Sequence, residues 1–137
     1  MSESHTVSIA RPDVDIHADV NNLILHYPPL ASDQHQIRIL VANGVVHLGG
    51  HVRSTPSRRY LIDAIPTIQG VTGVNDAALY DEDTLRLEIG KVLPAGVQVN
   101  MRYGTAILSG KLPDGTSEEE LVKLASLPGV ERVVVNF

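Results

Sequence analysis

The chain lacks cysteine and tryptophan altogether and has few aromatic residues of any kind. The absence of cysteine excludes disulfide scaffolds, thiol nucleophiles, iron–sulfur clusters and cysteine-ligated zinc sites. Four Tyr and one Phe among 137 residues are too few rings for a surface on which single-stranded nucleic acid could stack. The hydrophobic fraction of 43% must therefore come mainly from Val, Ile, Leu and Ala, and the sequence predicts an aliphatic core.

Positive charge is also scarce. The chain has 11 Lys and Arg residues against 16 Asp and Glu, which gives a net charge of −5 and an isoelectric point near 5.6. This balance argues against binding of DNA or an anionic membrane by bulk electrostatics. We therefore expect no nucleic-acid partner.

Long apolar runs are missing as well. The longest uninterrupted aliphatic runs, such as residues 39–42, are far shorter than the roughly 20 residues that span a bilayer. Residues 1–7 show no basic segment followed by an apolar stretch, the pattern typical of a secretory signal. We expect no transmembrane segment and a cytoplasmic location, or a periplasmic one if a leader has been removed.

The most informative feature of the sequence is an internal repeat. Residues 37–52 align with residues 97–112 at an offset of 60 positions. Each stretch reads as an alternating strand, a turn glycine, a second alternating strand and another glycine. Each is followed by a helical pattern and then by Gly-Val-x-x-Val, at 70–74 and 129–133. The first copy also carries nine extra residues within the loop of residues 25–36.

Acidic pairs precede the first helical pattern of each copy. Asp13 and Asp15 stand before one, and Asp81 and Asp83 stand before the other. Carboxylates at such positions accept hydrogen bonds from free helix amides and complement the helix dipole. Together with Glu82, these two pairs could also hold a cation, but the capping role explains both pairs without a ligand.

Turn and stop signals divide the rest of each copy. Asn43-Gly44 is a strong hairpin signal, because both central residues of a type I′ turn need positive φ, and Tyr103-Gly104 is a weaker version. Pro66 falls late in a helical pattern and should end or kink that helix.

These elements predict an α+β protein with two tandem α-β-β-α-β units. In each unit, two helices pack on one face of a three-stranded mixed sheet. We assign residues 12–80 to the first unit and 81–137 to the second. Residues 1–11 form an N-terminal segment. The alternation at residues 6–9 predicts an extra edge strand, which could be added to the sheet of the same chain or exchanged between subunits. Such small units are marginal alone, so we expect them to pack together or to oligomerise.

The duplicated motifs resemble the BON domain, a bacterial module named for osmotic-stress and nodulation proteins. The pattern Asn-Gly-x-Val-x-Leu-x-Gly-x-Val is carried by residues 43–52, and Gly-Val-x-x-Val by residues 70–74. The second copy departs from the pattern, with Tyr103 in place of the turn Asn. The resemblance implies a tandem BON-domain binding module with roles in phospholipid or envelope association, or in sensing of small ligands or ions. It supplies no catalytic residue and no cofactor.

Strand periodicity predicts the two faces of each sheet. In the first copy, the face turned away from the helices is apolar enough to need a cover, which could be the other repeat, another subunit or a ligand. The candidate interaction surface consists of Leu40, Val45, His47, His51 and Leu79. In the second copy, the corresponding face is more polar and includes Gln98, Asn100 and Arg102.

Candidate sites for chemistry are few. His47 and His51 share a strand face but lie roughly 13 Å apart along it, too far to bind one ion. A metal site would need His17, His26 or His35 to converge from elsewhere, and no HExxH spacing exists. We therefore expect neither a metal nor a catalytic site.

One basic cluster remains. Its candidate phosphate or headgroup contacts are Arg53, Arg58 and Arg59. The sequence thus predicts a non-enzymatic binding or scaffold protein that acts through its sheet surfaces. Its partner is a second copy of itself or another protein, and the alternative is association with a phospholipid membrane.

Overall fold

The computed structural model describes residues 10–137. The predicted edge strand at residues 6–9 lies outside this range. The first unit contains α1 (Asp13–Leu25), α2 (Pro28–Ala31), η1 (Gln34–Gln36), β1 (Ile37–Ala42), β2 (Val45–Val52), α3 (Thr55–Ala64), η2 (Ile65–Thr67) and β3 (Gly73–Asp81). The second unit contains α4 (Glu82–Val92), β4 (Val97–Arg102), β5 (Thr105–Gly110), α5 (Glu118–Ala125) and β6 (Arg132–Asn136).

The two units have the same topology. The first sheet has the order β1-β2-β3 and the second has the order β4-β5-β6. In each, the first two strands form an antiparallel hairpin and the third pairs in parallel with the second. The parallel pair needs a crossover connection, which α3 and α5 provide. The predicted α+β fold of two α-β-β-α-β units is confirmed.

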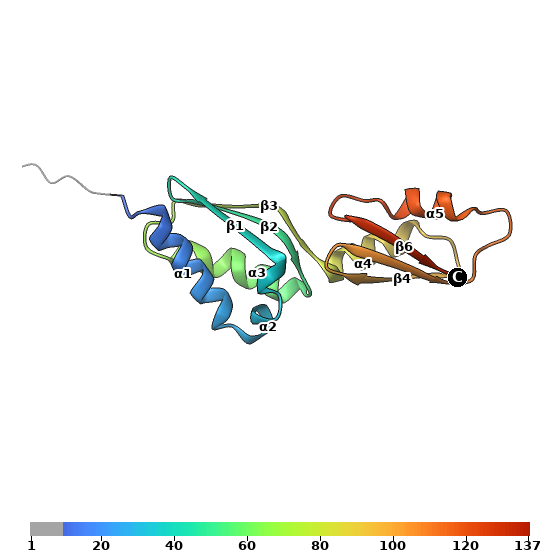
Figure 1. The fold of residues 1–137 in the computed structure, drawn as a ribbon, viewed down its shortest axis with the longest axis horizontal. Coiled ribbons are helices and arrows are strands. Elements are labelled where there is room, and N and C mark those ends of the chain that lie inside the picture. Colours follow the sequence, from blue (N-terminus) through green and yellow to red (C-terminus); the bar gives the residue numbers. More distant parts are fainter. Residues whose placement is uncertain (1–9) are drawn as a thin grey trace, which may run out of the picture.

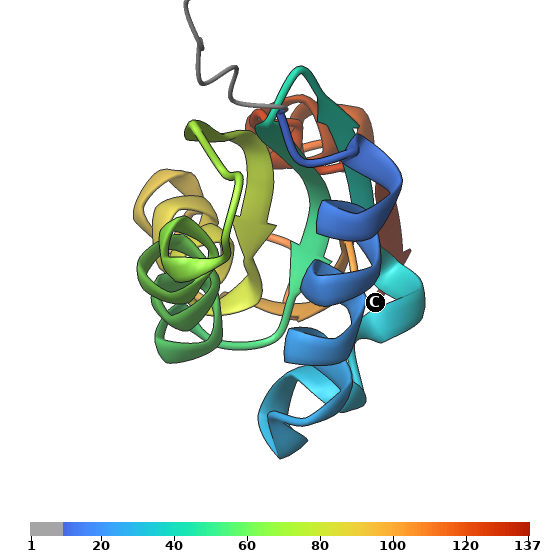
Figure 2. The same ribbon diagram turned by 90° about the vertical axis from the view of Figure 1, so that its left-hand side faces the viewer.

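The units follow each other along the long axis of the molecule (Figures 1 and 2). Strand β3 ends at Asp81 and α4 begins at Glu82, so no linker separates them. In the view of Figure 1, α1 and α3 lie below the strands of the first sheet, and the opposite face of this sheet is left open.

Both hairpins close with the turn that the sequence predicts. Asn43 and Gly44 have φ of 51° and 80°, and Tyr103 and Gly104 have φ of 45° and 86°. A type I′ turn needs positive φ at both central residues. Tyr103 adopts this conformation although it has a Cβ, and the side chain is held by contacts described below.

The role predicted for Asp13 needs correction. Helix α1 begins at Asp13 itself, its N-cap is Pro12, and no side chain caps it. The carboxylate of Asp13 instead accepts hydrogen bonds from the backbone amides of Asn43 (3.0 Å) and Gly44 (2.9 Å). The helix start therefore fixes the hairpin turn, which would otherwise leave its amides unpaired.

The second unit uses the same device with a different residue. Glu82 is buried and accepts a hydrogen bond from the backbone amide of Tyr103. Asp81 caps α4 and accepts from the backbone amide of Thr84 at 2.9 Å, as the sequence predicts.

Each unit has its own aliphatic core, built from the inward strand positions that periodicity predicts. The first core includes Val46, Leu48 and Val52, and the second includes Met101, Ala106 and Leu108. Helix α3 ends at Ala64 and a 3-10 turn containing Pro66 follows, which confirms the predicted stop.

Periodicity predicts Leu79 on the outer face of the first sheet, and this prediction is wrong: Leu79 is 2% exposed and belongs to the first core. Strict alternation along β3 fails because the pairing with β2 shifts between His47 and Gly49. A bulge adds one residue to a strand and reverses the direction of every side chain beyond it.

The nine extra residues of the first copy are also more than a loop. They contain α2 and η1, and Leu30 is fully buried in the first core. Tyr27 stacks on Tyr60 with ring centroids 3.9 Å apart. Asp33 in the same segment is fully buried and contributes to the contact between the units.

Candidate interaction surface

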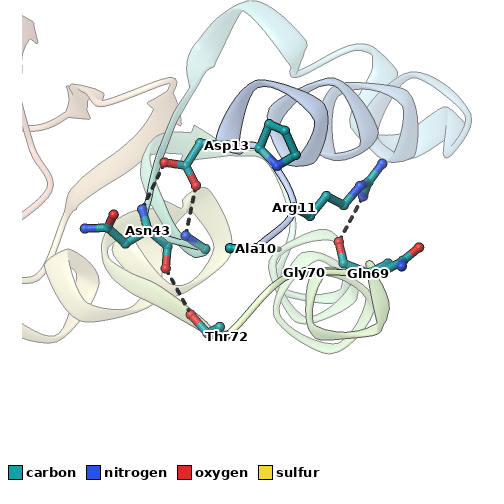
Figure 3. Close-up of a pocket in the computed structure, with 9 residues that line it drawn as sticks. Ala10, Arg11, Asp13, Asn43, Gln69, Gly70 and Thr72 are labelled. Carbon is teal, nitrogen blue, oxygen red and sulfur yellow. Dashed lines mark hydrogen bonds between the residues drawn. The ribbon is translucent and has the colours of Figure 1, made fainter. Parts of the chain in front are cut away.

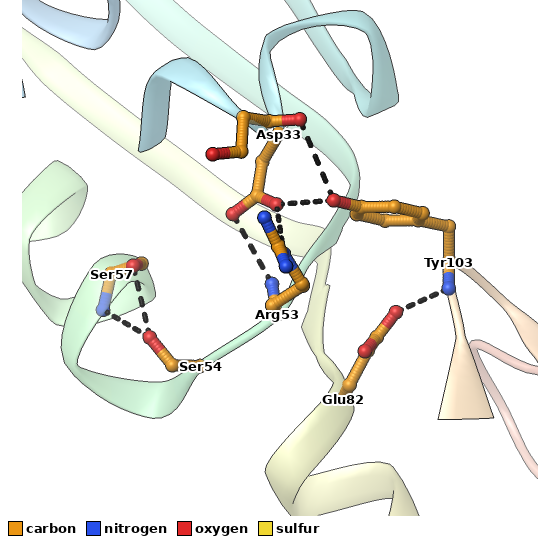
Figure 4. A network of polar contacts seen from close by, with 7 residues as sticks. Asp33, Arg53, Ser54, Ser57, Glu82 and Tyr103 are labelled. Atoms are coloured by element: carbon orange, nitrogen blue, oxygen red, sulfur yellow. Dashed lines mark hydrogen bonds and ion pairs between the residues drawn. The ribbon is translucent and has the colours of Figure 1, made fainter. Parts of the chain in front are cut away.

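The junction between the two units is held by a buried carboxylate (Figure 4). The hydroxyl of Tyr103 donates to Asp33 at 2.6 Å. The backbone amide and the Nε of Arg53 also donate to the Asp33 carboxylate, each at 3.3 Å. A buried carboxylate is stable only when it is hydrogen-bonded and paired, and Asp33 has both kinds of partner.

The pKa of Tyr103 reflects this position. Burial, together with the hydrogen bond to Asp33 and the negative charge of that carboxylate, raises the pKa of Tyr103 to about 12. Tyr103 therefore stays protonated, and able to donate to Asp33, over the whole physiological range.

His51 lies at the same junction. It is 4% exposed, its Nε2–H donates to the carbonyl of Gly129 at 2.6 Å, and its ring stacks on Tyr80. The second unit approaches so closely that a Cβ on Gly104 would meet the His51 ring at 2.8 Å. His51 is thus a contact between the units, and the other repeat, one of the three covers predicted for this face, covers it at this point.

Helices α3 and α4 meet at the junction through a second carboxylate. Asp81 accepts from the Thr55 hydroxyl at 2.7 Å and from the Thr84 hydroxyl at 2.8 Å. Burial pushes the pKa of Asp81 upward, but the hydrogen bonds from Thr55 and Thr84 outweigh it and hold this pKa below its ordinary value.

The predicted basic cluster is dispersed by ion pairs. Arg53 pairs with Asp33, and Arg58 pairs with Asp76. Arg58 also donates from Nε to the carbonyl of Leu79 at 3.0 Å. Arg59 is exposed on α3. Two of the three guanidinium groups are therefore engaged by the protein itself, and the headgroup contact stays a prediction.

The outer face of the first sheet retains three of the five predicted surface residues. Strand register places Leu40 beside His47, and Val45 two pairs further toward the turn. Leu40 is 65% exposed, whereas Val45 and His47 are half-buried. A shallow hollow of about 430 Å³ opens on this face, lined partly by Leu40 and His47. This part of the face is mainly apolar, with the exposed Arg38 at its far end.

A larger hollow lies at the opposite end of the first unit, near its hairpin turn (Figure 3). Its volume is about 570 Å³, and Asp13 and Arg11 contribute its charged groups. Both oxygens of Asp13 already bind turn amides, and Arg11 donates to the carbonyl of Gln69 and pairs with Asp19. These groups hold the fold and leave little for ligand recognition.

Residues 10–137 contain no cluster of three or more His, Asp or Glu side chains with the geometry to hold a metal ion. None of the helices within this range has the length and apolar character that crossing a membrane requires.

The sequence interpretation assigned no role at the junction to Asp33, Tyr103 and Glu82. A signal for two of them was available, since Asp33 lies in the segment inserted only in the first copy and Tyr103 replaces the turn Asn only in the second. These two departures from the repeat contact each other at the junction.

A search of curated proteins found no match. Two solved structures of CdsD, a structural protein of the type III secretion system of Chlamydia trachomatis, are similar in part. The C-terminal domain matches with a TM-score of 0.36 and 16% identity over 93% of this chain and 100% of that one. The second structure matches with a TM-score of 0.36 and 14% identity over 88% of this chain and 90% of that one. Likeness at this TM-score carries no functional conclusion.

The BON domain family matches residues 12–80, a range that runs from the residue before α1 to the last residue but one of β3. The match ends where the second unit begins, although the second unit repeats the same topology. This matched range is just over half of the chain. The protein belongs to the BON domain family.

Proposed function

We propose that the protein is a non-enzymatic interaction module in which residues 81–137 form a second, diverged BON unit. Partner proteins, including further copies of this chain, bind the outer face of the first sheet. The observation that carries the proposal is the exposed Leu40 on an uncovered apolar face. Apolar sheet faces without a cover are typical of interfaces.

The chemistry of the surroundings supports a protein partner over a lipid partner. Arg53 and Arg58 are both paired with carboxylates, and the chain carries a net charge of −5. Headgroup binding would need free cations at a surface, because the attraction to anionic lipid depends on them. The outer face offers mainly aliphatic side chains and a histidine, although it also carries the exposed Arg38 at one end.

Photo-crosslinking tests this proposal. The photoreactive residue p-benzoylphenylalanine replaces His47 at the centre of the outer face in bacterial cells that make the chain. Position 107 is the control, because Ile107 has the equivalent place in the second sheet. We expect protein adducts from position 47 and far fewer from position 107. Equal yields, or lipid adducts alone from position 47, would contradict the proposal.

A vesicle assay tests the lipid alternative directly. The chain is co-sedimented with phosphatidylglycerol-containing vesicles at low and high salt. We expect no binding in either condition, whereas headgroup binding through arginines would appear at low salt and weaken at high salt.

A further inference from the structure

We propose that two copies of the chain associate through the free edge of β1, which pairs antiparallel with β1 of the second copy and sets Leu40 against Leu40 of the partner subunit. This inference rests on the proposed function and names a partner and a geometry for it. The pairing joins two three-stranded sheets into one continuous sheet.

The main chain of β1 has unpaired groups along this edge. The two-residue turn at 43–44 makes Ala42 and Val45 a hydrogen-bonded pair, and bonding alternates along the hairpin from there. The N–H and C=O groups of Ile39 and Val41 therefore point away from β2. Within residues 10–137, no loop or side chain contributes a hydrogen bond to either residue on this side. A row of unpaired groups of this kind is a template for strand addition.

Apolar side chains flank the edge on both sides. Val14 of α1 is 74% exposed and Leu40 is 65% exposed, the two highest values among the large hydrophobic residues of the described range. Between them runs a hollow of about 330 Å³ that also reaches Ile39 and Val41. A strand added here would gain backbone hydrogen bonds and would cover both side chains.

The other edge of the first sheet is closed. On β3, the guanidinium of Arg58 donates to the carbonyls of Leu79 (3.0 Å) and Asp76 (3.4 Å) and pairs with the Asp76 carboxylate. The bulge near Asp76 also interrupts the regular spacing of this strand. Both features prevent strand addition, which leaves β1 as the available edge of this sheet.

The second unit provides a matched comparison. The repeat aligns Leu40 with Asn100 and Val41 with Met101. The Oδ1 of Asn100 accepts from the backbone amide of Met101 at 3.0 Å, and this amide points to the free edge of β4 by the same hairpin register. A polar side chain thus occupies the edge of β4 where Leu40 leaves the edge of β1 free.

The sequence of β1 suits pairing with itself. With Leu40 at the two-fold axis, Ile39 lies opposite Val41 of the partner subunit, and their outward groups form the hydrogen-bonded pairs. Arg38 lies opposite Ala42 of the partner subunit, so no like charges meet across the strands. The two most apolar features of the edge, Leu40 and the Ile39–Val41 pair, become buried together.

A disulfide trap tests the pairing. The chain has no cysteine, so a Leu40→Cys variant can form a disulfide only between two copies. Residues at the axis form a non-hydrogen-bonded pair with Cα atoms about 4.5 Å apart, within the range for a disulfide. The matched control is Asn100→Cys. We expect the Leu40→Cys dimer to form at least on the order of tenfold faster, because pairing raises the local thiol concentration. Equal rates would overturn the inference.

Two further measurements complete the test. In the unsubstituted chain, hydrogen exchange of the Ile39 and Val41 amides should slow as protein concentration rises, and concentration-independent exchange would overturn the inference.

A Val7→Pro change in the Leu40→Cys background tests whether residues 6–9 pair with the β1 edge instead of a second copy of β1. Cross-linking should persist, and its loss would overturn the pairing of β1 with β1. Protein adducts from position 47 without a Leu40→Cys disulfide would leave the proposed function standing and remove this inference alone.

Discussion

The two units share one backbone topology but differ in the residues that face outward. At equivalent positions the first sheet has Leu40 on an open edge and the second has Asn100 bonded to its own edge. At this position the edge of the first sheet is therefore apolar, and the edge of the second is polar. A duplicated unit that keeps its core and changes its outer residues separates the requirements of folding from those of binding.

The units also differ in size. The inserted segment adds Leu30 and the stacked Tyr27–Tyr60 pair to the first core, and the second unit has no counterpart of this segment. Burial of apolar area is the main stabilising contribution in small domains. We therefore expect the first unit to be the more stable, and the second to depend on its contacts with the first.

The largest expected effect comes from a matched pair of core truncations. Leu48→Ala and Leu108→Ala remove equivalent buried side chains, and each should lower the free energy of unfolding by about 2–5 kcal/mol. Leu108→Ala should unfold the second unit while the first stays protected. Hydrogen exchange measured by mass spectrometry reports each unit separately. Simultaneous loss of protection in both units would show that they unfold as one.

A smaller effect is expected at the junction. Tyr103→Phe removes the hydroxyl that donates to the buried Asp33, and should cost about 1–3 kcal/mol because the carboxylate loses a partner. The control is Tyr60→Phe, which keeps the stacked ring. Chemical denaturation measures both variants. A Tyr103→Phe cost no greater than that of Tyr60→Phe would contradict a role for this bond in joining the units.

The same residue predicts a pH dependence. The pKa of Tyr103 is raised from 10.0 to about 12 in the folded protein. A raised folded pKa gives stability that is complete below pH 10 and is lost as the pH rises toward 12. Unfolding free energy should fall in this window for the unsubstituted chain and fall less for Tyr103→Phe. If the unfolding free energies of the two proteins fell in parallel with pH, the raised pKa would not belong to Tyr103.

Much of the fold followed from local signals in the sequence. The repeat, the Asn43-Gly44 turn and the inward strand positions were predictable because they depend on residues close in sequence. Leu79 was placed wrongly because the bulge in β3 arises from pairing with β2, and nothing in the local sequence of β3 marks it. Tertiary pairing, rather than alternation, decides the direction of that side chain.

The junction could not be predicted in the same way. Asp33 appeared to be part of an extra loop, and His51 appeared to be one more outward residue of its strand. Both contact the second unit, His51 at Gly129 and Asp33 at Tyr103. Sequence periodicity describes one sheet at a time, so it carries no information about which end of that sheet meets another unit.

The smallest expected effect concerns α4. Gly90 lies within this helix, and a Cβ built on it would meet no atom within 4 Å. Gly90→Ala should stabilise the second unit by about 0.5–1 kcal/mol, since glycine loses the most backbone entropy on folding. Thermal denaturation measures this gain. A loss of stability would indicate that this helix face is covered in the assembled protein.

Sedimentation equilibrium tests the difference between the units most directly, through a pair of variants in which each takes the residue of the other. Leu40→Asn gives the β1 edge the polar residue of the β4 edge. Asn100→Leu gives the β4 edge the apolar residue of the β1 edge. We expect the unsubstituted chain to shift from 14.8 kDa toward twice this mass as concentration rises, and Asn100→Leu to reach at least that mass, because its second edge is freed as well. Leu40→Asn should stay at the monomer mass. Association of Leu40→Asn equal to that of the unsubstituted chain would contradict the assignment of the binding edge to the first unit.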